Sequence, residues 1–162
     1  MAVNKEYKKT VQDEIDWKII DQLHSATLNF SSTSLELKKL LFVLIGIAVP
    51  SLIKLAGDKL DMSLFITVYL LSLTFWFLDS LTYYYQEILR EKMDIRFKQI
   101  MARNVETIIS TEKSNNNFTL ENNRTDKDRI RRSAFNPSVK LYMFVFGLNT
   151  IGLFLYLIDA VS

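Results

Sequence analysis

Asp79 is the clearest candidate for chemistry in the chain, because it lies inside a run of otherwise uncharged residues. The run covers residues 62–85, and a helix that crosses a bilayer needs about 20 such residues. A carboxylate at the centre of that helix costs roughly 2.5–3.5 kcal/mol on insertion scales and faces a bundle interior or a wet cavity. Near one end of the helix the cost is lower, and Asp79 would then only mark the interface. Both interpretations predict a membrane protein.

Further polar side chains share a helical face with Asp79. Ser72 precedes it by seven residues, and Thr82 and Tyr83 follow it by three and four. These spacings place side chains on one side of a helix. In a single protomer this face is satisfied inside a helical bundle, whereas in an oligomer a ring of carboxylates lines a water path and favours cations.

Aromatic residues and one amide complete the set of candidates. Phe75 and Trp76 are either interfacial belt or packing residues, or part of a hydrophobic plug that opens by rewetting. Asn149, in a later apolar segment, is either a hydrogen-bonding residue between helices or a pore residue. The candidate pore or gate residues are Ser72, Phe75, Trp76, Asp79, Thr82, Tyr83 and Asn149.

Composition argues against an enzyme. The chain has no cysteine, one histidine and four glycines, which leaves no thiol nucleophile and little material for a phosphate-binding loop. No hydrolase, P-loop or zinc-protease motif is present in the sequence. We therefore predict no catalytic residue, no metal site and no cofactor.

A basic segment precedes the last apolar block. It is either a positive-inside flank attracted to anionic lipid or a binding site for a phosphate-rich ligand such as a nucleotide or an oligonucleotide. Base stacking has little support, because Phe135 is the aromatic residue near it. The candidate ligand-binding residues are Arg124, Lys127, Arg129, Arg131 and Arg132.

Three apolar blocks, at residues 40–56, 62–85 and 141–158, predict an all-α integral membrane bundle with three transmembrane helices. The first block has an uncharged core of only 14 residues, 40–53, which is short for a span. Snorkelling by the flanking Lys38, Lys39 and Lys54 would extend it, and a tilted or re-entrant segment remains the alternative.

The remaining segments are predicted from periodicity and capping signals. Residues 10–30 form an amphipathic helix that packs on other helices or, alternatively, lies on lipid headgroups. A Ser/Thr run at 31–34 ends this helix, and Thr33 with Glu36 forms a capping box for the next one. After a turn at 57–59, the second span continues as a cytosolic stalk to Ile109, with an apolar stripe that needs a partner. Pro137 begins the third span.

We therefore predict four segments. They are a cytosolic amphipathic helix (1–33), a transmembrane hairpin whose second span extends as the stalk (34–110), a polar then basic cytosolic loop (111–138) and a third transmembrane helix (139–162). Lysine and arginine gather on the N-terminal flank and between the second and third spans, which places the N-terminus in the cytoplasm and the C-terminus outside.

The stretch FWFLDSLTYYYQEILR at residues 75–90 resembles a pattern in small bacterial membrane proteins of anti-phage defence, namely the SLATT group and the membrane effector of the Hailong system. In these proteins an aromatic-rich span ends in an Asp, followed by Tyr-Tyr and a charged helix. The resemblance implies an oligomeric pore that disrupts membrane potential on infection. It also implies an operon-encoded nucleotidyltransferase and a nucleotide or single-stranded oligonucleotide regulator.

The expected function is that of a homo-oligomeric channel in the bacterial inner membrane, a pore-forming effector of abortive infection gated by a cytosolic ligand. The alternative is a non-conducting scaffold or accessory subunit that recruits a cytosolic partner through its stalk. Membrane lipid is an expected partner of both.

Overall fold

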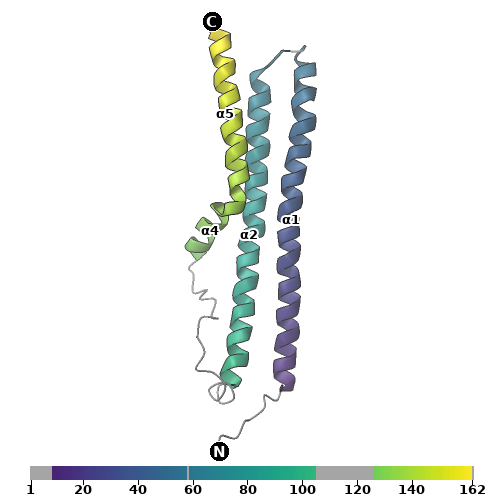
Figure 1. The fold of residues 1–162 in the computed structure, drawn as a ribbon, viewed down its shortest axis with the longest axis vertical. Coiled ribbons are helices and arrows are strands. Elements are labelled where there is room, and N and C mark those ends of the chain that lie inside the picture. Colours follow the sequence, from purple (N-terminus) through teal and green to yellow (C-terminus); the bar gives the residue numbers. More distant parts are fainter. Residues whose placement is uncertain (1–8, 58, 105–125, 162) are drawn as a thin grey trace, which may run out of the picture.

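The computed structural model describes residues 9–57, 59–104 and 126–161, and this part of the chain is helical without strands. Its elements are the α-helices α1 (Val11–Leu55), α2 (Met62–Arg103), α4 (Asp126–Ala134) and α5 (Lys140–Val161), with the 3₁₀ turn η1 (Pro137–Val139) before α5. Helices α1 and α2 form a long antiparallel hairpin, and α5 lies along one half of it (Figure 1).

Helix α1 is continuous over 45 residues, so the predicted interruption at residues 31–34 is wrong. Its N-terminus is capped by Thr10, which exchanges side-chain and backbone hydrogen bonds with Asp13. Thr33 does not cap a helix, because its hydroxyl donates to the backbone oxygen of Asn29, one turn earlier, at 3.0 Å. A threonine hydroxyl can bond back in this way inside a helix, and the packing of α1 along α2 outweighs its weak helix propensity.

Helix α2 runs from the apolar block into the charged region without a break, as the sequence predicts. Asp61 caps its N-terminus, where its carboxylate accepts from the backbone N–H of Met62 at 2.8 Å. On the far half, Lys98 and Asp94 form an ion pair four residues apart, at 3.2 Å. The helix ends at Arg103, and the predicted continuation over residues 105–109 lies outside the described residues.

The apolar parts of α1, α2 and α5 lie side by side at the end of the rod that holds the α1–α2 turn and the C-terminus (Figure 1). Two core clusters join them. One contains the buried residues Leu41, Phe75, Val139 and Tyr142, and the other contains Leu64, Phe65, Val68 and Val145. Pro137 begins η1, in the first turn before α5 as predicted, with Asn136 as its N-cap.

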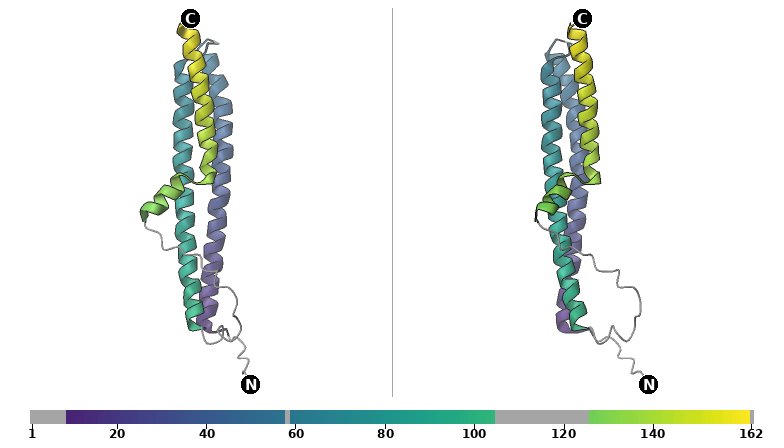
Figure 2. Two further views of the ribbon diagram at one scale, coloured as in Figure 1. Left: turned by 60° about the vertical axis from the view of Figure 1, so that its left-hand side comes forward. Right: turned by 90° about the vertical axis from the view of Figure 1, so that its left-hand side faces the viewer.

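In the described part of the chain, the other half of the rod consists of α1 and α2, and α4 contacts α2 near the middle of the rod and slants outward from there (Figure 2). Aromatic pairs hold the two long helices together, with Trp17 edge-on to Phe97 at 5.8 Å and Phe30 stacked on Tyr85 at 5.7 Å between ring centroids. The first half of α1 thus covers the stalk part of α2, which is the packing alternative of the two that the sequence left open.

Candidate functional site at the base of α5

The carboxylate that the sequence predicts as the main site forms an ion pair. Asp79 of α2 is 1% exposed, and one of its oxygens lies 2.9 Å from the Nζ of Lys38 on α1. Lys38 reaches inward from the base of the apolar half, and its side chain is 17% exposed. An opposite charge at this distance offsets much of the cost of burying a carboxylate. Asp79 is therefore buried and neutralised within a single protomer.

Hydroxyl groups complete the environment of the Lys38–Asp79 pair. Lys38 donates to the hydroxyl oxygens of Ser34, one turn earlier on α1, and of Ser138 in η1, each at 2.7 Å. Ser34 in turn donates to a carboxylate oxygen of Asp79. Tyr142, which is fully buried, lies next to the same carboxylate. The pair thus connects α1, α2 and the base of α5, and we call these five residues the Lys38–Asp79 cluster.

The other predicted pore residues of α2 also point into the protomer. Ser72, Phe75 and Thr82 are buried, and Trp76 and Tyr83 are half-buried. Thr82 donates its hydroxyl to the backbone oxygen of Asp79 at 2.7 Å, which satisfies it within its own helix. The shared face inferred from spacing therefore exists, and in this conformation α1 and α5 cover it.

Asn149 acts as a link between helices. Its side-chain amide, on α5, donates to the backbone oxygen of Phe65 on α2 at 3.0 Å. One residue further along α5, the hydroxyl of Thr150 lies 2.7 Å from that of Tyr69. Of the two alternatives for Asn149, this geometry matches the hydrogen bond between helices.

Sequence reasoning missed the partners of Asp79. The sequence pattern indicates a snorkelling role for Lys38 and gives no signal for Ser34, Ser138 or Tyr142. A usable signal was present, since a carboxylate in an apolar helix requires a cation nearby and Lys38 flanks the adjacent apolar block. The choice among Lys38, Lys39 and Lys54 depends on the rotation of α1 about its axis, which spacing alone does not determine.

The candidate basic residues divide into three groups. Arg129 is 7% exposed and pairs with Glu91 of α2 at 2.7 Å, so it holds α4 against α2. Lys127, Arg131 and Arg132 are exposed on α4. Arg124 lies outside the described residues. The structure thus leaves three of the predicted basic residues accessible to a ligand.

A second charged network closes the opposite end of the hairpin. Asp13 and Asp16 of α1 are fully buried, and the guanidinium of Arg103 contacts both. Arg96 also pairs with Asp16, at 3.3 Å. Burial alone would raise the pKa of Asp13, but hydrogen bonds from Thr10, Arg103 and Asn104 outweigh it and lower that pKa to about 2. The two carboxylates raise the pKa of Arg103 above its ordinary value.

The fold and site define a class of protein, although no family can be assigned. The described part of the chain is all-helical, and two helical segments in it, Met62–Arg103 and Lys127–Ile158, are long and apolar enough to cross a membrane. No group of three metal-ligating side chains occurs among the described residues. Comparison with protein-family models, curated proteins and solved structures finds no match for the chain.

Proposed function

We propose that the protein is a three-span membrane protein of the bacterial inner membrane, with its N-terminus in the cytoplasm. Two segments are long and apolar enough to cross a membrane, and the shorter apolar part of α1 packs against both of them. The exposed side chains of this half are largely apolar, including Phe42, Ile47 and Phe144, which suits contact with lipid. The charged halves of α1 and α2 would then extend into the cytoplasm as a stalk.

We further propose that the chain acts as a homo-oligomeric channel-like effector in anti-phage defence and that this conformation is its closed form. The observation that carries the proposal is the polar face of α2, enclosed within the protomer and held shut by the Lys38–Asp79 pair. A buried ion pair between helices contributes little net stability, because the desolvation of its two charges offsets their attraction, so moving both charges into water costs little. Opening would separate α1 from α2 and expose Asp79 to a water path.

Membrane potential in bacteria that express the chain tests this proposal. Lys38→Met removes the partner of Asp79 and should depolarise cells more than the wild type, whereas Lys39→Met, an exposed neighbour, should match the wild type. Asp79→Ala should reduce the leak through an open form. If Lys38→Met and Asp79→Ala both leaked at the wild-type rate, the pair would not have the role assigned to it.

A second candidate function is a non-conducting scaffold, favoured by exposed apolar side chains on the stalk such as Ile15 and Ile95. In that case the stalk would recruit a cytosolic partner. Membranes would remain tight in every variant, including Lys38→Met. Shortening the α1–α2 stalk in register, by whole turns of both helices, would abolish partner binding without loss of membrane insertion.

A further inference from the structure

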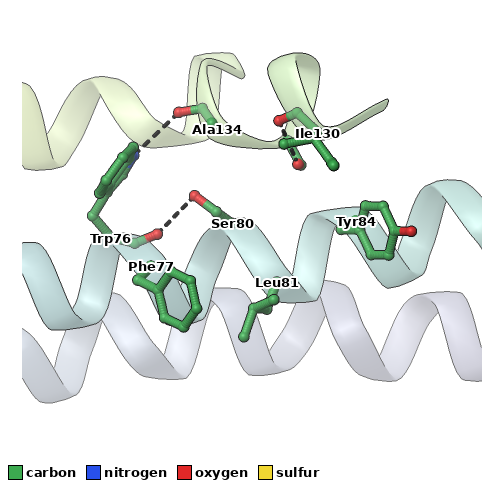
Figure 3. A pocket seen from close by; sticks show the side chains of 8 residues that line it. Trp76, Phe77, Ser80, Leu81, Tyr84, Ile130 and Ala134 are labelled. Carbon is green, nitrogen blue, oxygen red and sulfur yellow. Dashed lines mark hydrogen bonds between the residues drawn. The ribbon is translucent and has the colours of Figure 1, made fainter. Parts of the chain in front are cut away.

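Helix α4 and α2 enclose an apolar groove that the proposed function does not use. The groove has a volume of about 320 Å³ and is lined by Trp76, Phe77, Ser80, Leu81, Tyr84, Ile130, Ser133 and Ala134 (Figure 3). Two hydrogen bonds shape it. The indole N–H of Trp76 donates to the backbone oxygen of Ala134 at 3.1 Å, and Ser80 donates to the backbone oxygen of Trp76 at 2.8 Å. We call it the α2–α4 groove.

The position of the groove along α2 corresponds to the inner boundary of the membrane. Trp76 lies 14 residues and Tyr84 22 residues after Met62, which corresponds to about 21 Å and 33 Å of helix at 1.5 Å per residue. With Met62 at the outer boundary of the hydrocarbon, about 30 Å thick, the groove crosses the inner boundary. Its Trp76 end then faces acyl chains and its Tyr84 end faces headgroups.

Positively charged side chains of α4 lie towards the Tyr84 end of the groove. Figure 3 shows Ala134 beside Trp76, and Ile130 further along α2 towards Tyr84. By helical spacing, Lys127 and Arg131 share the face of α4 next to Ile130, and both are exposed. Lys127 is one turn nearer the cytosolic end. Two exposed cations therefore lie on α4 near the headgroup end of the groove, on a helix that also carries the exposed Asp128.

We propose that the α2–α4 groove binds an anionic phospholipid, with an acyl chain between Trp76 and Leu81 and its phosphate beside Lys127 and Arg131. The inference rests on the three-span insertion proposed above. The apolar lining of the groove excludes a free phosphate as occupant, because the ion would lose its hydration there and gain no polar partner from the apolar walls. The cations at one end distinguish an anionic lipid from a zwitterionic one.

Native mass spectrometry of the purified full chain, taken from nanodiscs of equal parts phosphatidylglycerol and phosphatidylcholine, tests the inference. The wild type should retain phosphatidylglycerol in preference. Arg131→Gln should lower that preference about fivefold, which corresponds to the loss of about 1 kcal/mol for one cation beside an anionic headgroup. Arg132→Gln is the matched control, because Arg132 lines a different hollow, with Tyr83 and Arg90, and should leave the preference unchanged.

Two further arms separate the alternatives. Ser80→Phe fills the groove and should remove bound lipid of both kinds, whereas millimolar inorganic phosphate should displace none. The inference would be overturned if the wild type retained the two lipids equally or if phosphate displaced the bound lipid. It would also be overturned if Arg131→Gln and Arg132→Gln had equal effects. A dimer that holds no lipid would instead assign the groove to a second copy of the chain, and so would also overturn it. Release of the chain from membranes by alkaline carbonate would contradict the three-span proposal itself, which keeps the two failures distinct.

Discussion

The Nζ of Lys38 and a carboxylate oxygen of Asp79 lie 2.9 Å apart, and this contact joins α1 to α2 where α5 begins. The two residues are 41 positions apart in sequence, and their helices run in opposite directions. The pair places a charge at the end of an apolar helix bundle without leaving it exposed. The closed form and the opening proposed above both depend on this contact.

The Lys38–Asp79 contact should appear as a coupling energy. Lys38→Met leaves a buried carboxylate without its cation and should destabilise the fold by about 3–5 kcal/mol. Removing both charges, in Lys38→Met with Asp79→Asn, should be much less harmful than the sum of the single changes. Denaturant unfolding in detergent, followed by helical circular dichroism, measures this cycle. Additive single effects would show that the two side chains do not interact.

Low pH should loosen the far end of the stalk through Asp13. Its pKa of about 2 lies below the ordinary value of 3.8, so its interactions with Thr10, Arg103 and Asn104 contribute stability that is fully present above pH 3.8. That stability should be lost as the pH falls through about 2. The melting temperature between pH 5 and pH 2 measures it, and Asp13→Asn should show a flatter profile. An identical pH dependence in the two proteins would contradict the assignment to Asp13.

The α2–α5 contact should tolerate a side chain at one glycine of α5 and not at another. A Cβ at Gly152 would lie 3.3 Å from the ring of Phe65, whereas one at Gly147 would meet nothing within 4 Å. Gly152→Val should therefore cost about 1–3 kcal/mol through overpacking. Gly147→Val is the matched control, with the same change of residue in the same helix. Denaturant midpoints in detergent measure the difference, and equal midpoints would place Phe65 elsewhere.

The continuity of α1 should make Thr33 sensitive to proline but not to alanine. Within a helix, Thr33→Pro costs about 3 kcal/mol or more, while Thr33→Ala at this exposed position is nearly neutral. At a helix N-cap the alanine variant would instead cost about 1 kcal/mol. Spin labels on either side of residue 33 would report the helix length directly. A shortened distance in the wild type would restore the predicted interruption.

Much of the helical content could be predicted from sequence because periodicity and apolar length are local properties. The continuity of α2, the turn after Leu55 and the position of Pro137 before α5 follow from such signals. The predicted interruption at residues 31–34 is wrong because that prediction also used only local signals. A local capping signal favours a break, and only contact with α2 makes the continuous helix more stable.

The candidate site was half predictable. The shared face of Ser72, Asp79 and Thr82 depends on spacing within one helix, which the sequence contains. The partner of Asp79 cannot be predicted in this way, because Lys38 reaches Asp79 only through the rotation and register of α1 against α2. The same holds for the buried pair of Asp13 and Arg103, whose residues lie at opposite ends of the hairpin's sequence.

By itself, then, the sequence determined an all-helical protein with apolar segments long enough to cross a membrane and a carboxylate on a polar face of one of them. Hydrophobic length and helical spacing act over a few turns, so a linear chain carries them. The tertiary structure alone decided that Asp79 is neutralised within the protomer, that Arg129 is used in packing, and that α2 and α4 enclose an apolar groove. These outcomes depend on which helix faces meet, because pairing and burial are set by contacts between residues distant in sequence.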